Sequence, residues 1–165
     1  METIDFNSIQ SLKANGFQGF QRIGELFVSC QDIPDEVGVY FVIHDNDDIP
    51  EFMVRGSGGI LKESDPNVSI IELERNWVGE TKVIYIGQTG NSLRKRISSY
   101  MKFGQGEPVR HYGGRYIWQI KNHEDLLVCW KSLNGNRANP KQVESDLLRI
   151  FVEGYSCLPF SNLKK

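Results

Sequence analysis

The sequence lacks a hydrophobic run long enough to cross a membrane, since none approaches the roughly 18 residues that a spanning helix needs. Its first residues are too acidic and too polar to begin a secretion signal. Cysteine is scarce: Cys30, Cys129 and Cys157 are far apart and include no CxxC pair. We therefore expect no disulfide framework and no structural zinc site, and we expect a cytoplasmic protein that makes no membrane contact.

The glycine-rich stretch at residues 56–59 lacks two features of a phosphate-binding P-loop. No Lys-Ser or Lys-Thr pair follows it, and no strand precedes it. A plain loop is the better interpretation. The chain of 165 residues is 39% hydrophobic and 24% charged, which is typical of one soluble globular domain.

Positive charge is also scarce in the first half of the chain, and the net charge of the whole chain is −2. Residues 1–81 contain five basic and fifteen acidic side chains, residues 82–121 contain eight and one, and residues 122–165 contain six and five. Contacts with phosphates depend on the positive charge near the binding surface more than on the net charge of the whole chain. Residues 82–121 therefore predict a DNA-binding face. The alternative is that their basic side chains are only the solvated surface of a helix. Its candidate contacts are Arg94, Lys95, Lys102, Arg110, His111 and Arg115.

Three apolar runs predict strands, at residues 37–43, 83–86 and 126–130. On a strand, side chains two positions apart share a face, so Tyr40 lies beside Gly38, and Tyr85 lies beside Gly87. Each tyrosine then has a neighbour without a side chain, which leaves room next to the phenol for a ligand. The alternative is that the tyrosines only fill a half-buried sheet.

Two helices follow the second and third strands. The helix that begins near Leu93 has an apolar stripe flanked by Arg96, while Lys95 points away from it. In the last helix, Glu144 falls in the middle of an apolar stripe. A carboxylate that faces a core needs a cation or hydrogen bonds to replace its hydration. A metal ion or Arg96 would supply this, and a purely structural ion pair is the alternative.

These elements resemble the GIY-YIG nuclease superfamily from about residue 34 to the end of the chain. The resemblance extends over four elements in the family order, and each has a suitable predicted local structure. They are Gly38-Val39-Tyr40, Tyr85-Ile86-Gly87 followed by Leu93-Arg94-Lys95-Arg96-Ile97, Glu144 in the last helix, and Leu158-Pro159-Phe160-Ser161-Asn162. The resemblance implies an α/β domain with a small three-stranded, mostly antiparallel sheet flanked by helices. It also implies a metal-dependent endonuclease that hydrolyses DNA phosphodiester bonds.

The family pattern assigns a role to five residues. Glu144 holds the metal, Tyr40 or Tyr85 activates the attacking water, Arg96 stabilises charge on the scissile phosphate, and Asn162 positions the site or the substrate. Of the two tyrosines we favour Tyr40 as the base. A phenol has an ordinary pKa near 10, so Arg96 and the cation would have to acidify it. With one matched carboxylate, we expect a single Mg²⁺ or Mn²⁺ ion.

Two other functions are compatible with the same residues. The first is a catalytically inactive or regulatory nucleic-acid-binding module on the same fold, and the second is an enzyme that acts on a small phosphate-bearing substrate. Gln88 stands where some family members carry a lysine, which leaves the proton-transfer partner open. Retention of all five matched residues favours the nuclease.

The remaining segments depart from the family. Residues 1–33 have hydrophobic residues at roughly helical spacing and predict a helical extension. Residues 44–81 form an insertion where the family has a short turn, and this insertion is expected to fold over one edge of the site or to contact a partner. The aromatic segment at residues 110–120 predicts a short helix after a glycine turn.

Overall fold

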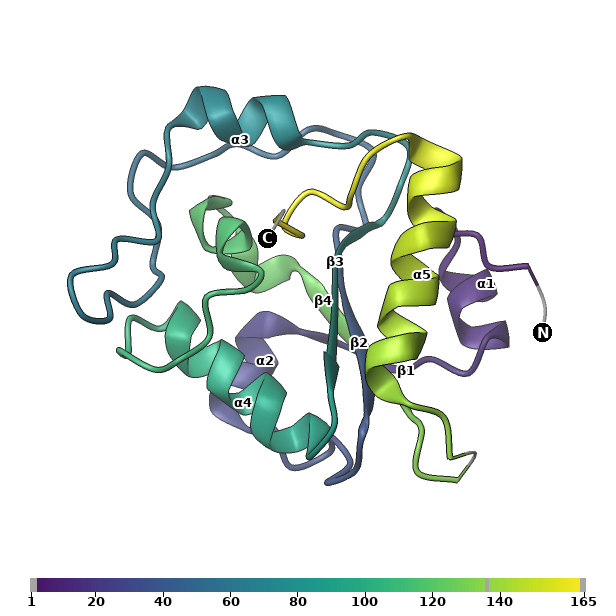
Figure 1. The fold of residues 1–165 in the computed structure, drawn as a ribbon. Helices are drawn as coiled ribbons and strands as arrows, with labels where there is room; N and C mark the ends of the chain where they lie inside the picture. Colours follow the sequence, from purple (N-terminus) through teal and green to yellow (C-terminus); the bar gives the residue numbers. More distant parts are fainter. Residues whose placement is uncertain (1–2, 136, 164–165) are drawn as a thin grey trace.

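In the computed structural model, which describes residues 3–135 and 137–163, the chain forms an α/β fold (Figure 1). Its sheet has four antiparallel strands in the spatial order β1-β4-β2-β3. The strands are β1 (Gln18–Arg22), β2 (Gly38–Ile43), β3 (Val83–Thr89) and β4 (Leu127–Ser132). The helices are α1 (Ile9–Ala14), α2 (Ile23–Val28), α3 (Ile70–Asn76), α4 (Leu93–Gly104) and α5 (Pro140–Tyr155), with the 3-10 turns η1 (Arg115–Gln119) and η2 (His123–Asp125).

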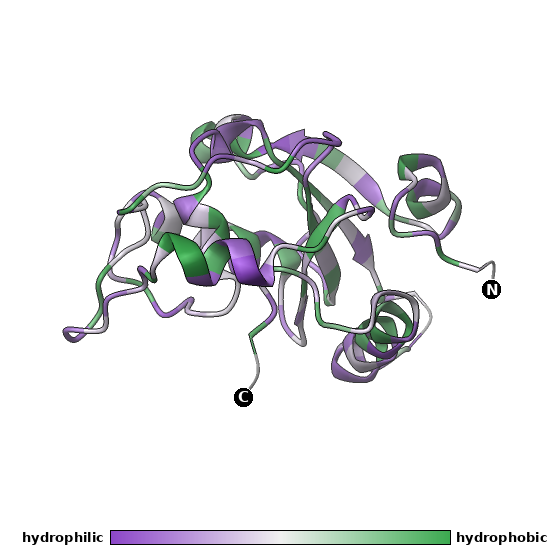
Figure 2. Ribbon diagram, turned by 90° about the horizontal axis from the view of Figure 1, so that it is seen from above, coloured by the Kyte–Doolittle hydropathy of each residue, from purple (hydrophilic) through white to green (hydrophobic). Residues whose placement is uncertain are grey.

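Strand β2 is buried along its whole length because helices cover both faces of the sheet. Tyr40 and Val42 point into one apolar cluster, which includes residues of α2 and α4. Val39, Phe41 and Ile43 point into a second cluster, against α1 and α5. Figure 1 shows α4 and α5 on opposite sides of the strands, and Figure 2 shows hydrophobic residues in the central strands between these layers. The predicted α/β class is thus confirmed.

The prediction of three strands was wrong, because the N-terminal segment contributes a fourth. It forms α1, β1 and α2, and β1 pairs with β4 at the edge of the sheet. Gly16 and Gly19 have positive φ angles of 93° and 94°, which interrupt the helical spacing. A Cβ atom on Gly19 would lie 2.5 Å from the Trp130 ring. The strand therefore depends on a contact with a residue far along the chain.

Helix α4 begins at Leu93, where the sequence predicts. Ser92 caps α4, and its side chain accepts a hydrogen bond from the Lys95 amide. Asn139 caps α5 in the same way, and Pro140 occupies the first turn, where a missing amide costs nothing. No helix in the described ranges combines the length and hydrophobicity that a bilayer crossing requires.

The insertion at residues 44–81 is folded against the body of the domain and contains α3. The buried side chain of Gln119, in η1, holds it at several points. Its amide donates to the carbonyls of Met53, Val54 and Val68, and its oxygen accepts from the Val68 amide. Gln119 therefore ties two separate parts of the insertion, at residues 53–54 and at residue 68, to η1.

Candidate active site

The Tyr40 ring packs directly on Gly87, its partner across strands β2 and β3. A Cβ atom on Gly87 would lie 2.4 Å from Cζ of Tyr40 and 2.6 Å from its hydroxyl oxygen. The space predicted over Gly87, beside Tyr85, is therefore filled by the Tyr40 ring. The space predicted over Gly38, beside Tyr40, is filled as well, because a Cβ atom there would lie 2.7 Å from the Leu93 side chain, so the expectation of free space for a ligand was wrong. Tyr40 has no exposed surface, and Tyr85 is 6% exposed.

A chain of aromatic rings surrounds these two tyrosines. The centroids of Tyr40 and Tyr85 are 6.0 Å apart, and those of Tyr85 and Tyr100 are 5.6 Å apart. His111 stacks on Tyr100 at 4.2 Å. The Tyr100 hydroxyl donates a hydrogen bond of 2.6 Å to the Gly114 carbonyl, which ties α4 to the loop before η1. Tyr100 was not among the predicted site residues, so its role in holding the site was missed.

Arg96 extends from α4 into this aromatic cluster. Its Nε atom is buried and has no hydrogen-bond partner among the described residues. Both ring nitrogens of His111 are buried and unpaired in the same way. The Tyr40 hydroxyl is also buried and makes no hydrogen bond of normal geometry to a described residue, although Arg96 and Tyr85 lie close enough to lower its pKa. Buried polar groups are almost always satisfied in folded proteins, so several unsatisfied ones together indicate a position for water, an ion or a substrate group. The unpaired atoms belong to residues around one point, next to Tyr100.

The tyrosines are held in their neutral form. Burial raises the pKa of Tyr40, and the nearby positive charge of Arg96 opposes this shift without reversing it. Burial also raises the pKa of Tyr85 well above its ordinary value, with a further contribution from Tyr40. The phenol that the sequence expected Arg96 to acidify is therefore not acidified in the protein alone. Ionisation of either tyrosine requires additional positive charge.

Glu144 reaches the same region from α5, on the other side of the sheet. Its negative charge adds to the effect of burial in raising the pKa of both Tyr40 and Tyr85, so its carboxylate lies within electrostatic range of the two phenols. Glu144 is half-buried on a helix whose Phe151 is fully buried.

The donor set suits a hard divalent cation with few protein ligands. Glu144 supplies one carboxylate in the region of the phenols, and Mg²⁺ commonly keeps several waters and takes further oxygens from substrate phosphates. The described residues contain no group of three or more His, Cys, Asp or Glu side chains arranged for a metal. A site with one carboxylate does not require such a group.

The side chain of Asn162 hydrogen-bonds to the backbone of β3. Its side-chain oxygen accepts a 2.9 Å hydrogen bond from the Ile86 amide, and its amide group donates one of 2.9 Å to the Ile86 carbonyl. The neighbouring Ser161 amide donates to the Ile84 carbonyl. The segment after α5 thus pairs with the free edge of β3, next to Gly87. Both polar ends of the Asn162 side chain are used in this contact, which fits a residue that positions the site.

The predicted DNA-binding residues differ in their exposure. Arg94, Lys95, Lys102 and Arg110 are exposed, and Arg115 is half-buried. His111 does not fit the expected surface contact, because it is only 1% exposed. Burial and the positive charge of Arg96 lower its pKa to about 3, so it is uncharged at neutral pH. The glycines beside His111 indicated a loop and gave no sign that its ring stacks on Tyr100.

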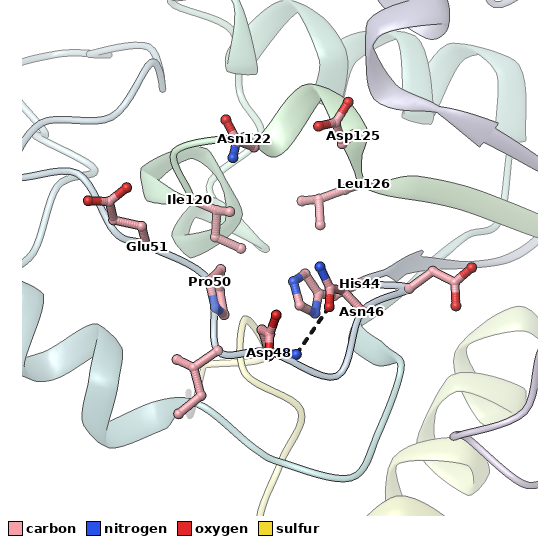
Figure 3. Close-up of a pocket in the computed structure, with 11 residues that line it drawn as sticks. His44, Asn46, Asp48, Pro50, Glu51, Ile120, Asn122, Asp125 and Leu126 are labelled. Carbon is pink, nitrogen blue, oxygen red and sulfur yellow. Dashed lines mark hydrogen bonds between the residues drawn. The ribbon is translucent and has the colours of Figure 1, made fainter.

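A cavity of about 320 Å³ lies away from this cluster, between the start of the insertion and η2 (Figure 3). Asp45, Asp48, Glu51 and Asp125 are among its lining residues. Asp45 pairs with Lys82, and Asp125 pairs with Arg22. Its acidic lining has the wrong sign for a phosphate.

The structure therefore brings Tyr40, Tyr85 and Arg96 together from β2, β3 and α4, and it places Glu144 of α5 within electrostatic range of the two phenols. Asn162 lies at the adjoining strand edge. Comparisons with models of protein families, with characterised proteins and with solved structures find no match to this chain. The function must accordingly be argued from the motifs and from the geometry of these residues.

Proposed function

We propose that this protein is an endonuclease of the GIY-YIG type, which hydrolyses DNA phosphodiester bonds at one site with one Mg²⁺ or Mn²⁺ ion. The observation behind the proposal is the convergence of two neutral phenols, one arginine and one carboxylate. These groups come from β2, β3, α4 and α5, and each corresponds to a residue of the family pattern. The exposed basic residues of α4 and the following loop support DNA as the partner.

The roles follow from charge and burial. Arg96 presents a guanidinium with an unpaired Nε–H, which is suited to the negative charge that develops on a phosphate during hydrolysis. Glu144 would hold the cation, which when bound polarises the phosphate and lowers the pKa of water. In the protein alone Tyr40 is neutral, so it must lose its proton before it can act as a base. A cation held by Glu144 would supply the positive charge that favours this ionisation.

Asn162 and Tyr100 position these groups. Asn162 fixes the backbone of β3 at Ile86, between Tyr85 and Gly87. It therefore holds in place both the strand that carries the Tyr85 phenol and the glycine on which the Tyr40 ring packs. Tyr100 fixes the loop whose Gly113 and Gly114 pack against Tyr85. A shift of about 1 Å at a catalytic group commonly reduces the rate strongly.

The direct test is cleavage of plasmid, single-stranded and branched DNA in Mg²⁺ and in Mn²⁺. Glu144→Gln keeps the shape of the side chain and should abolish cleavage while DNA is still bound. Arg96→Lys keeps the charge but loses the planar fork, and we expect cleavage to fall about 100- to 1000-fold. A matched control is Arg149→Lys, an exposed residue of α5, which should cleave normally.

Two outcomes would contradict the proposal. Full activity of Glu144→Gln would remove the metal-ligand role. DNA binding without cleavage of any substrate, in either metal, would favour the inactive nucleic-acid-binding module.

A further inference from the structure

A second cleft, with a volume of about 720 Å³, adjoins the candidate active site. Its lining comes from four segments: Glu72 and Asn76 from the insertion helix α3, Arg115 and Tyr116 from η1, Val152 from α5, and the chain after α5 as far as Leu163. Asn162 belongs both to this lining and to the clamp on β3. The cleft therefore begins at the strand edge that holds Gly87 and Tyr85.

The lining of this cleft is close to electrically neutral. Arg115 lies over the Tyr112 ring at 4.6 Å and near the Tyr116 ring at 5.8 Å. Glu72 accepts a 2.8 Å hydrogen bond from the Tyr116 hydroxyl. Burial and the contact with Glu72 raise the pKa of Tyr116 to about 12, so this hydroxyl stays protonated. One arginine and one glutamate balance each other, which disfavours a bare phosphate as the occupant.

The remaining lining offers what an uncharged nucleobase needs. An arginine plane held by aromatic rings is a platform on which a base stacks. Glu72 and Asn76 supply hydrogen-bonding groups for a base edge, and Leu158 and Leu163 supply apolar surface. The volume falls within the ordinary range of ligand sites, about 300 to 1,000 Å³. An intact duplex is too wide to enter such a cleft, but a nucleotide that has left its stack is not.

We infer that this cleft binds an unstacked nucleobase a few nucleotides from the scissile phosphate, so that the insertion selects DNA with a single-stranded or locally opened segment. The inference rests on the proposed nuclease function. Val152, which also lines the cleft, is eight residues beyond Glu144 on α5, or about 12 Å along the helix. That distance corresponds to a few nucleotide steps.

The first test measures affinity in EDTA, where no cleavage occurs, for a short oligothymidylate and for a hairpin duplex. Arg115→Ala should weaken oligothymidylate binding about tenfold, since loss of one stacking contact has effects of this size. Its affinity for the duplex should change less than about twofold. Arg55→Ala removes an exposed arginine of the insertion that does not line the cleft, and it should change neither affinity. Equal losses for both ligands in Arg115→Ala would overturn the inference.

The second test uses Cys157, an exposed thiol in the lining of the cleft. Cys129 is buried and Cys30 is half-buried, so Cys157 should react first with N-ethylmaleimide. Saturating oligothymidylate should slow this reaction at least about fivefold, and the hairpin duplex should not. Cys157→Ser identifies the labelled position. Unchanged labelling under saturating oligothymidylate would refute the binding site.

The outcomes separate the two proposals. Cleavage of DNA without protection of Cys157 leaves the nuclease function intact and removes the cleft assignment. Protection of Cys157 by single strands, in a protein that cleaves nothing, supports the cleft and removes the catalytic proposal.

Discussion

Substitution of Gly87 by alanine tests whether the close packing of Tyr40 on this glycine is required for function. The new Cβ atom would lie 2.4 Å from Cζ of Tyr40, whereas carbon atoms pack at about 3.5 to 4.0 Å, so the ring must move by more than about 1 Å. Tyr40 is fully buried against Tyr85 and Tyr100, so its ring cannot move away from Gly87 without disturbing these contacts. Overpacking of this kind costs about 1 to 3 kcal/mol in the free energy of unfolding.

Two measurements follow on the same protein: urea unfolding and single-turnover cleavage. Gly87→Ala should unfold at lower urea concentration with an unchanged m-value, and its cleavage rate should fall at least about tenfold because the phenol is displaced. Gly90→Ala is the matched control, since a Cβ atom added there would meet nothing within 4 Å and the φ angle of Gly90 is not positive. If Gly87→Ala were as stable and as active as Gly90→Ala, the reasoning about Tyr40 would be refuted.

Three further substitutions test the remaining features of the site. His111→Phe keeps an aromatic ring and removes two unpaired nitrogens. The pKa of His111 is about 3 in the folded protein and 6.5 ordinarily, so protonation of the unfolded chain destabilises the wild-type protein as pH falls below 6.5. In urea titrations the wild type should therefore lose about 2 kcal/mol of unfolding free energy by pH 5 that the variant does not lose. An equal pH dependence of the two proteins would exclude a buried neutral imidazole. Asn162→Ala removes both hydrogen bonds to Ile86 and should lower the free energy of unfolding by about 2 to 4 kcal/mol with little change in DNA affinity; a loss of affinity at unchanged stability would instead assign Asn162 to substrate contact. Lys95→Gln with Lys102→Gln should reduce the slope of log affinity against log salt by about one unit for each lost phosphate contact, and an unchanged slope would identify both as solvated charges.

Local features of the sequence were enough to predict most of the scaffold. The predicted start of a helix near Leu93 is an example, because Ser92, which caps this helix, lies directly before it and the boundary can be read from neighbouring positions. The placement of Glu144 in an apolar stripe likewise follows from helical spacing alone. Strand β1 could not be predicted, because it depends on Gly19 packing against Trp130 on a strand about a hundred residues later.

The protonation and burial of the candidate site residues were harder to predict than which residues to propose. Motifs identified Tyr40 and Arg96, but the pKa of the phenol depends on burial by residues from several elements, which no local pattern encodes. His111 was assigned to the DNA-binding face because it lies in the basic segment 82–121, whereas its ring is buried on Tyr100. Asn162 was found through the motif, and its pairing with Ile86 became apparent only from contacts across 76 residues.

The burial of the two phenols also determines how a phosphate would approach this site. Tyr40 and Tyr85 are almost completely enclosed, whereas Arg96 and Glu144 are only partly buried, so an incoming phosphate meets the two opposite charges first. In the absence of a cation the Glu144 carboxylate repels the phosphate that Arg96 attracts. Glu144→Gln removes this repulsion and leaves the arginine. DNA affinity in EDTA should therefore stay the same or increase while cleavage is lost, and a large fall in affinity would mean that Glu144 supports the structure of the site.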